Sequence, residues 1–449
     1  MTTIRYRRTV LLLLCALSIA SPVMRAQSQE FPVSTRTLKN GMKVLVQPDH
    51  SIPNVALYIF YRIGSRNEHP GTTGLSHFFE HMMFNGAKKY GPGDLDKVME
   101  ANGGSNNAYT TQNVTVYQDW FPRSALSLIY DIESDRIRDL TFDPKKIASE
   151  REVVASERRL SVDNNNFGLL DEQLWATAFI AHTYQWPVVG WMSDIEHWTM
   201  DDLKHHFEMG YSPSNATMVV VGDVSSDEIF QLCEKYIEPI PTHAPPPLVT
   251  TVEPEQLGER RLVVHKPAEL PIVMIGYHVA QTNNPDFYAL NILRSVLFQG
   301  ESSRMYQRLV DKDQLALDVS SDVEPAFDPT LVIVTAQPRQ GVDPQACEKA
   351  IYEELDKVKG SPIGDQELEK AKNNRLVEFY REMRTINGRA NTIGTYEVFM
   401  GDYNKLFDAA RSYSAVTKED VQRVAKEYFG ANNRTVATLL PEDEGKAKQ

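Results

Sequence analysis

The feature that most constrains the fold of this 449-residue chain is an internal repeat. Each copy predicts a helix with a capped start, followed by a strand. The matching residues lie at a constant offset of 218 positions: Thr199, Asp201, Asp202, Leu203, Asn215 and Thr217 against Thr417, Glu419, Asp420, Val421, Asn433 and Thr435. A repeat over this distance predicts two halves of about 200 residues with similar folds.

The elements expected around the repeat are both helical and extended. Alternating apolar and polar residues predict strands at 38–46 and 54–61, with a hairpin turn at Asn40-Gly41, and Thr, Val and Tyr predict one long strand at 106–119. Helical patterns occur at 74–86, 94–102, 124–139, 144–161, 171–182 and 199–209. The expected fold class is therefore α+β: two homologous domains, each a mixed or antiparallel sheet covered by helices.

The N-terminus predicts a secretory signal peptide. Arg5, Arg7 and Arg8 precede an apolar stretch at residues 9–20, and small residues lead to Ala26, in the order typical of such signals. The apolar stretch is short for a membrane span, and an uncleaved membrane anchor is the alternative interpretation. We expect a periplasmic or secreted protein without stable membrane insertion.

A proline-rich segment separates the two halves. Six prolines lie in or beside residues 240–257, a composition typical of a linker. The predicted organisation is a signal peptide, a first domain, a linker and a second domain, at residues 1–26, 27–240, 241–257 and 258–449.

Charge and cysteine content exclude several classes of protein. The formal net charge is −13, which argues against binding to nucleic acid and to anionic membrane surfaces. Cys233 and Cys347 remain after the predicted cleavage, so the fold cannot depend on a disulfide framework. Two buried thiols and a single disulfide are both open interpretations.

Residues 74–86 contain the motif H-x-x-E-H in an apolar helix that we expect to end at Gly86. His77, Glu80 and His81 fall within about a 100° arc of such a helix. Two imidazoles at i and i+4 can hold one metal ion, and the carboxylate beside them can act on a water molecule there. The pattern also occurs by chance, but three titratable groups in so apolar a helix are costly to bury without a partner. A metal ion is the simplest such partner.

The charged helix predicted at 144–161 supplies candidates for a third ligand. A catalytic zinc needs three protein ligands and an open position. Glu150 and Glu157 are seven residues apart and therefore lie on one face of this helix. A solvent-exposed carboxylate is the alternative interpretation for Glu150.

The motif together with these glutamates resembles the pitrilysin/insulinase family of zinc peptidases, the inverzincins. The length is most similar to the branch of mitochondrial processing peptidase and its bacterial relatives. The resemblance spans residues 31–440 and includes further motifs: Leu38-x-Asn40-Gly41, Asn106-Asn107-Ala108-Tyr109-Thr110, Pro187-x-x-Gly190, Tyr211-x-Pro213-x-Asn215-Ala216 and Gly222-Asp223.

The resemblance implies one Zn²⁺ per chain and a role for each site residue. His77, His81 and Glu157 would be the metal ligands. Glu80 would be the general base that takes a proton from the attacking water, and Glu150 a second catalytic carboxylate that orients the ligands. Asn107 and Ala108 would contact a peptide substrate that adds to an exposed edge strand; an ordinary internal strand is the alternative interpretation.

The second half departs from the family pattern. The H-x-x-E-H residues have Asn291, Arg294 and Ser295 opposite them. Active single-chain members carry an Arg and a Tyr seven residues apart in the second half, which stabilise the developing oxyanion. Val310 and Leu317 occupy these two positions. We therefore expect a heterodimer in which this chain holds the zinc and a homologous partner supplies the Arg and Tyr; a homodimer is the other pairing.

The predicted function is a zinc-dependent endopeptidase that hydrolyses unfolded peptides in a closed chamber. The alternative is a non-catalytic structural or peptide-binding subunit of the same fold. A purely structural subunit has no reason to retain His77, Glu80, His81 and Glu157 together.

Overall fold

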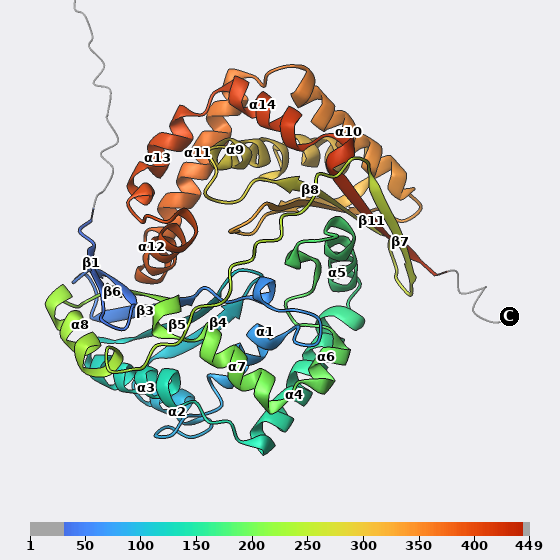
Figure 1. Ribbon diagram of the computed structural model, residues 1–449. Helices are drawn as coiled ribbons and strands as arrows, with labels where there is room; N and C mark the ends of the chain where they lie inside the picture. Colours follow the sequence, from blue (N-terminus) through green and yellow to red (C-terminus); the bar gives the residue numbers. More distant parts are fainter. Residues whose placement is uncertain (1–30, 443–449) are drawn as a thin grey trace, which may run out of the picture.

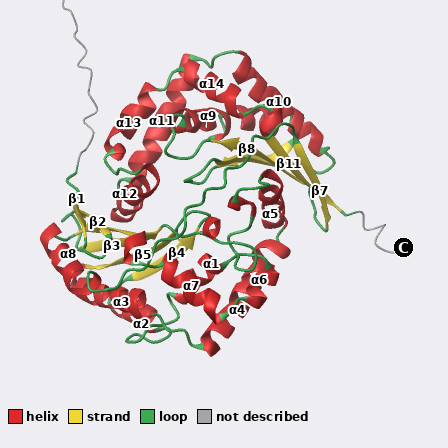
Figure 2. Cartoon of the chain, viewed as in Figure 1, coloured by secondary structure: helices red, strands yellow, loops and turns green. Residues whose placement is uncertain are grey.

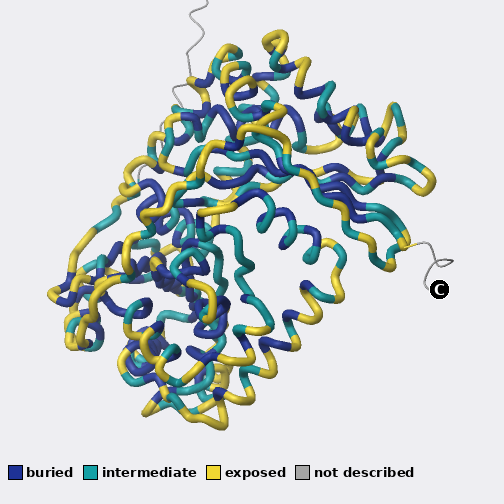
Figure 3. The backbone as a smooth tube through the Cα atoms, turned by 45° about the vertical axis from the view of Figure 1, so that its right-hand side comes forward, coloured by how far each residue is buried: buried dark blue, intermediate teal, exposed yellow. Residues whose placement is uncertain are grey.

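The computed structural model describes residues 31–442 and consists of two sheets flanked by helices (Figure 1, Figure 2). The predicted signal peptide lies outside the described residues. Buried residues follow the strands of both sheets (Figure 3). The chain is thus an α+β protein with two halves, as the repeat predicts.

The first half is built on a six-stranded sheet in the order β1-β2-β6-β3-β5-β4. Its strands are β1 (Ser34–Thr37), β2 (Lys43–Pro48), β3 (Asn54–Tyr61), β4 (Ser105–Thr110), β5 (Thr115–Pro122) and β6 (Ala216–Gly222). Its helices are α1 (Leu75–Met82), α2 (Asp94–Ala101), α3 (Leu126–Asp139), α4 (Pro144–Arg158), α5 (Asn166–Ala178), α6 (Met192–His197), α7 (Met200–Gly210) and α8 (Ser226–Leu232). The hairpin predicted at Asn40-Gly41 joins β1 to β2, and Gly41 has the positive φ of +92° that its turn requires.

The second half repeats this plan with five strands in the order β7-β11-β8-β10-β9. The strands are β7 (Arg260–Lys266), β8 (Ile272–Val279), β9 (Ala316–Asp322), β10 (Thr330–Pro338) and β11 (Arg434–Pro441). The helices are α9 (Phe287–Phe298), α10 (Pro344–Gly360), α11 (Asp365–Glu382), α12 (Ile386–Met400), α13 (Lys405–Ala415) and α14 (Lys418–Tyr428). In each half the last strand along the chain pairs in parallel with a strand from the start of that half: β6 with β2, and β11 with β7. The repeat is therefore structural as well as sequential.

The capped helices of the repeat have identical starts. Thr199 caps α7 and Thr417 caps α14, and in each case the aspartate three residues later completes a reciprocal capping box. Each helix then leads into an internal strand of its sheet, β6 or β11. The offset of 218 residues thus reflects two equivalent helix–strand units.

Several predicted elements have different bounds in the structure. The strand expected at 38–46 is β2, which begins at Lys43 after the turn at Asn40-Gly41, and the helix expected at 144–161 is α-helical to Arg158. The long strand expected at 106–119 is the hairpin of β4 and β5, because the Thr111 hydroxyl accepts backbone N–H groups of Asn113 and Val114 and turns the chain. Helix α1 ends at Met82, four residues before Gly86. Helix α5 begins at Asn166 instead of 171, because the Asn165 side chain caps its first turn.

The two halves exchange helices. Helix α5 of the first half packs on β7, β8 and β11 of the second sheet, and α12 of the second half packs on β3 and β6 of the first sheet (Figure 1). The two helices are equivalent, since α5 follows α4 and α12 follows α11. Leu170 and Leu174 join one shared core and Ile393 the other. Each half therefore buries an apolar face of the other.

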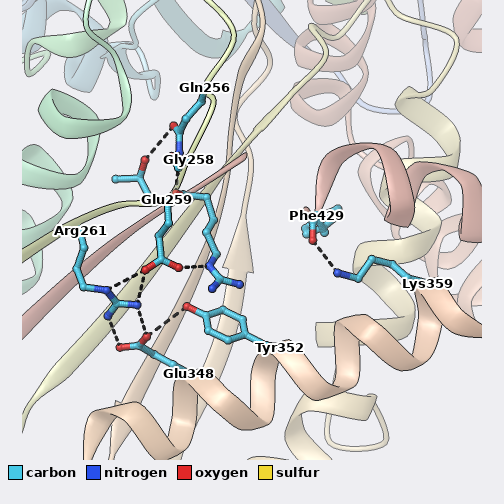
Figure 4. A network of polar contacts seen from close by, with 10 residues as sticks. Gln256, Gly258, Glu259, Arg261, Glu348, Tyr352, Lys359 and Phe429 are labelled. Atoms are coloured by element: carbon cyan, nitrogen blue, oxygen red, sulfur yellow. Dashed lines mark hydrogen bonds and ion pairs between the residues drawn. The ribbon is translucent and has the colours of Figure 1, made fainter. Parts of the chain in front are cut away.

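The segment at 241–257 contains no helix or strand, yet its end is held firmly. The Gln256 amide donates to the carbonyls of Gly258 and Arg434, as Figure 4 shows. Glu259 and Glu348 both accept hydrogen bonds from Arg261 in the same network. These contacts fix the entry of the chain into β7 beside β11.

Cys233 and Cys347 are both buried free thiols, each in the core of its own half. The two-thiol interpretation is therefore the one that the structure supports. Within residues 31–442 there is no helix with the length and apolarity needed to cross a membrane.

The close packing of α12 on the first sheet generates a prediction. A Cβ at Gly394 would overlap the ring of the fully buried Phe60. We expect Gly394→Ala to lower the free energy of unfolding by about 1–3 kcal/mol through overpacking, despite the higher helix propensity of alanine. Thermal denaturation measures this. Gly360→Ala, where a Cβ meets nothing within 4 Å, is the matched control, and an equal or higher stability of Gly394→Ala would contradict the exchange packing.

Candidate metal centre

The helix α1 places its apolar residues in the core of the first half and its polar triplet on the opposite side. Leu75, Phe78, Phe79 and Met82 pack into the main core. The helix lies against α4, α7, β4 and β5. His77 and His81 are thereby turned toward Glu150 and Glu157 of α4.

The start of α1 is held by a close backbone contact at Gly74 and by the carboxylate of Glu68. Gly74 caps the helix with φ +88°, and a Cβ there would lie 2.5 Å from the carbonyl oxygen of Val189. The Glu68 carboxylate, which is 4% exposed, accepts hydrogen bonds of 2.7 Å from the N–H groups of Gly74 and Ser76. Burial raises the pKa of Glu68 to about 7. This carboxylate takes the place of the missing side-chain cap.

Two tyrosines hold the middle of α1. The Tyr211 hydroxyl donates to the carbonyl of Ser76 at 3.1 Å, and the Tyr117 hydroxyl donates to the carbonyl of Phe79 at 2.9 Å. Both tyrosines are fully buried. The helix that carries the motif is therefore rigidly attached to the sheet.

The structure brings His77, His81 and Glu157 together. One ligand atom from each lies within 4.8 Å of the others. The carboxylate of Glu157 is 3.6 Å from His77 Nε2 and 3.3 Å from His81 Nε2. Within residues 31–442 this is the only group of three or more His, Cys, Asp or Glu residues arranged in this way.

Glu150 approaches the second histidine from behind. Its Oε1 lies 2.8 Å from His81 Nδ1, and its Oε2 accepts a 2.7 Å hydrogen bond from the Asn85 amide. Asn85 also donates to the carbonyl of His81 at 3.3 Å. A carboxylate on the far nitrogen fixes the orientation of a ligating imidazole and raises its basicity. Glu150 thus holds the His81 ring from the side opposite to Glu157.

The charges of the cluster favour a cation between the carboxylates. Burial works to lower the pKa of His81, but hydrogen bonds with Glu150 and Glu157 raise it to about 9. Hydrogen bonds from His77 and His81 hold the pKa of Glu157 well below its ordinary value. The hydrogen bond with His81 likewise lowers the pKa of Glu150. Both carboxylates are therefore ionised at neutral pH.

The donor set fits a zinc ion. Two imidazole nitrogens and one carboxylate oxygen form a three-ligand set of the kind that catalytic zinc sites use, with a fourth position left for water or substrate. The Glu157 side chain is 44% exposed, whereas those of His77 and His81 are 11% and 22% exposed. The open side of the centre is therefore the side of Glu157.

Glu80 and the strand residues flank the centre. Glu80 is half-buried on α1 between the two histidines. Asn107 and Ala108 lie on β4, which pairs with β5 alone and packs against α1. The structure thus makes β4 an edge strand and excludes the internal-strand interpretation. Its unpaired backbone groups are available to an added strand.

The second half has no equivalent centre among its described residues. On α9, Arg294 donates to the carbonyl and hydroxyl of Ser321 on β9, and Ser295 donates to Gln299. Gln299 in turn donates to Glu378 of α11. Val310 stands at the position of the expected Arg and is 8% exposed, and Leu317 stands at the position of the expected Tyr and is 46% exposed. Neither side chain can donate a hydrogen bond.

The sequence pattern did not identify several residues that support the centre. Glu68 binds backbone N–H groups of α1, and Asn85 binds the Glu150 carboxylate. Neither contact produces a sequence spacing typical of metal ligands. Arg158, 5% exposed and adjacent to Glu157, pairs with Glu172 of α5 at 2.7 Å and donates to the carbonyl of Gly190. One signal could have indicated Glu68: a glycine at the start of a helix has no side chain to accept the first backbone N–H groups, so another residue must accept them.

The sequence and the fold were compared with known proteins. The family model described as "Insulinase (Peptidase family M16)" matches residues 43–190, and that described as "Peptidase M16 inactive domain" matches residues 197–375. Zinc protease PqqE of Helicobacter pylori is 33% identical over 422 residues, which cover 93% of this chain and 95% of the relative.

Two solved structures have a similar fold. A protease from Helicobacter pylori gives a TM-score of 0.89 at 32% identity, over 92% of this chain and all of that chain. The periplasmic protease PqqL from Escherichia coli gives a TM-score of 0.75 at 19% identity, over 91% of this chain but 47% of that chain. With both halves matched by the family and a relative similar over almost the whole length, the chain belongs to the insulinase family of peptidases, peptidase family M16.

Proposed function

We propose that the chain is a zinc-dependent endopeptidase whose metal is held by His77, His81 and Glu157. The observation that carries this proposal is the convergence of these three side chains from α1 and α4, with Glu150 bonded to the far nitrogen of His81. The name of the Helicobacter relative, a zinc protease, supports the same metal and reaction.

Each residue near the centre has a task in peptide hydrolysis. A bound Zn²⁺ would supply a Lewis acid that polarises the scissile carbonyl and water. Glu80 accepts the proton of the attacking water and passes it to the leaving amine. Glu150 holds the His81 ring in place. The free edge of β4 at Asn107 and Ala108 binds the peptide backbone as an added strand, which suits unfolded peptides of varied sequence.

A partner chain would complete the site. Val310 and Leu317 provide no hydrogen bond donor for the developing oxyanion, and such donors contribute strongly to acyl transfer. The fold of this chain corresponds to 47% of the PqqL chain, which supports a unit built from two such chains enclosing a chamber. We propose a heterodimer whose second, homologous chain carries the Arg and Tyr.

The alternative function is a non-catalytic subunit that binds peptides or supports an assembly. The inactive-domain description of the match at 197–375 favours it for the second half. The retention of Glu80 beside a complete ligand set favours catalysis for the chain as a whole. The name of the periplasmic PqqL and the signal peptide expected at 1–26 together support a location in the periplasm.

The first test concerns the proton acceptor. We expect Glu80→Gln to reduce hydrolysis of an unstructured peptide pool by about 10²–10⁴-fold, because proton transfer is lost, while zinc content stays at one ion per chain. Hydrolysis rates and metal analysis measure the two effects. Glu100→Gln, which changes an exposed glutamate of α2, is the control. If Glu80→Gln hydrolysed the peptides as fast as the unmodified chain, Glu80 would not be the proton acceptor.

The second test concerns the orienting carboxylate. We expect Glu150→Gln to weaken zinc affinity by about 10–100-fold, since His81 loses an ionised acceptor behind its ring. Competition with a chromophoric chelator measures the affinity. Glu152→Gln, an exposed neighbour on the same helix, should leave it unchanged. If both variants bind zinc alike, Glu150 has no role in the centre.

The third test concerns the partner. We expect the purified, zinc-loaded chain alone to hydrolyse the peptide pool slowly. A homologous chain that retains the Arg and Tyr should raise the rate by about 10²–10³-fold, the contribution of an oxyanion donor. Steady-state rates at varied ratios of the two chains measure this. Full activity of the isolated chain, abolished by Glu80→Gln, would refute the heterodimer but not the peptidase.

A further inference from the structure

A group of buried charges lies between α3 and β5, on the face of the first sheet that also carries α1 (Figure 1). Arg136 and Glu133 of α3 are 3% and 1% exposed, and Asp119 of β5 is 2% exposed. Arg136 Nε donates to Glu133 Oε2 at 2.9 Å, and Arg136 Nη2 lies 2.6 Å from Glu133 Oε1 and 4.0 Å from Asp119 Oδ2. The proposed hydrolysis uses none of these three groups.

Stability alone does not account for the buried ion pair. Burial and the neighbouring Glu133 carboxylate raise the pKa of Asp119 well above its ordinary value, so Asp119 is protonated at neutral pH. The pair of Arg136 and Glu133 remains. Apolar residues of similar volume often stabilise a core as well as a buried ion pair does, or better. A charged pair at this position therefore points to a task other than filling the core.

The guanidinium of Arg136 lies over two aromatic rings. It is 4.7 Å from the ring centroid of Tyr117 and 5.6 Å from that of Phe84, and the two rings are 5.9 Å apart. A cation within about 6 Å of a ring centroid is attracted to the ring, and more strongly where water is excluded. Arg136 thus links α3 to β5 and to the segment that follows α1.

The first ring holds the middle of α1. Tyr117 donates from its hydroxyl to the carbonyl of Phe79 at 2.9 Å, and Phe79 directly precedes Glu80. The Tyr117 ring lies between this hydrogen bond and the guanidinium of Arg136. A shift of the ring would therefore move the turn of α1 that carries Glu80.

The second ring holds the end of α1. The backbone N–H of Phe84 donates to the carbonyl of His81 at 3.0 Å. Phe84 directly precedes Asn85, whose amide donates to the Glu150 carboxylate at 2.7 Å and to the His81 carbonyl at 3.3 Å. A shift of Phe84 would therefore carry Asn85 away from Glu150, and Glu150 is the group that holds the His81 ring.

The backbone secures only the later part of this segment to the end of α3. Lys88 donates its N–H to the carbonyl of Asp139 at 3.1 Å, and Thr141 donates its N–H to the carbonyl of Gly86 at 3.2 Å. Both contacts lie beyond Asn85. The Arg136 side chain is accordingly the contact of α3 that reaches the segment before Gly86.

We propose that Arg136, held by Glu133, is a positioning residue of the metal centre, which fixes the rings of Tyr117 and Phe84 and thereby the end of α1. Arg136 itself lies away from the ligand atoms and acts through these two rings. The inference rests on the proposed function, because the centre that Arg136 positions is the proposed zinc site.

Removal of both members of the ion pair tests the proposal without leaving a buried charge. We expect the double variant Glu133→Met/Arg136→Met to fold with a melting temperature close to that of the unmodified chain. Its zinc affinity, measured by competition with a chromophoric chelator, should fall about tenfold, as for other residues that support metal ligands. The visible absorption of the cobalt-loaded chain, which reports coordination geometry, should change as well. A residue that only fills space would leave both readouts unaltered.

Two further variants separate positioning from general stability. Arg136→Lys keeps a cation beside Glu133 and the rings, so it should bind zinc more tightly than the double variant. Arg304→Met breaks an ion pair in the second half, where Arg304 binds Glu367 at 2.6 and 2.7 Å. Its zinc affinity and cobalt spectrum should equal those of the unmodified chain.

Amide hydrogen exchange in the metal-free chain gives a readout that does not depend on zinc. In the double variant the N–H groups of Phe84 and Asn85 should exchange about tenfold faster, because the local opening of this turn loses the attraction of a buried cation for the rings. The N–H groups of β11 should exchange at an unchanged rate.

The outcomes distinguish this proposal from the zinc function. If the unmodified chain binds zinc and the double variant matches it in affinity and cobalt spectrum, Arg136 has no positioning role and the zinc function stands. If the unmodified chain binds no zinc, the proposed function is wrong, and the exchange rates alone decide whether Arg136 holds the end of α1. A double variant that does not fold, or an equal loss of affinity in Arg304→Met, would make the ion pair a structural requirement and overturn the proposal.

Discussion

Each sheet has one apolar face that its own half leaves uncovered, and the burial of these two faces is the constraint on which the structure depends. The exchange of α5 and α12 satisfies it for both sheets at once. A fully buried aliphatic side chain contributes about 1.5–3 kcal/mol, so the shared cores stabilise the chain as one unit. Neither half of the repeat is structurally complete without the other.

The exchange also explains how the second half helps to position the cluster of His77, His81 and Glu157 in the first half. Glu157 lies at the end of α4, and a short π-helical turn at Arg159–Asp163 connects α4 to α5, which packs on the second sheet. Arg158 links the two helices through Glu172 and reaches the Gly190 carbonyl beside the start of α1. The position of Glu157 relative to His77 and His81 is therefore set by both halves together.

The sequence predicted the parts of the fold that local patterns encode. The repeat and the capping threonines can be read directly from the sequence, and they correctly indicated two similar halves. The H-x-x-E-H spacing placed His77 and His81 on one face of a helix, whereas Glu157 was selected by the resemblance to the family, and the structure places its carboxylate 3.6 and 3.3 Å from the two imidazoles. The turn at Thr111 was missed because a threonine hydroxyl can end a strand that its β propensity would continue. The exchange of α5 and α12 could not be predicted, because it depends on packing between segments far apart in the chain.

The support of the centre was equally hidden from sequence patterns. Glu68 satisfies backbone groups rather than ligands, and Gly74 is required because its neighbour is a carbonyl from residue 189. The importance of such residues follows from their contacts in the folded chain and not from a spacing in the sequence. A motif identifies the atoms that could bind a metal, and the surrounding close contacts decide whether those atoms converge.

The covering of each sheet by the other half limits how this chain can move. A hinge at residues 241–257 that opened the two halves would expose the apolar faces under α5 and α12 to water, at a cost comparable to partial unfolding. The two halves should therefore move together as one rigid body. If two such chains enclose a chamber, a peptide can enter or leave only when the two chains separate, and not through a movement of the two halves within one chain.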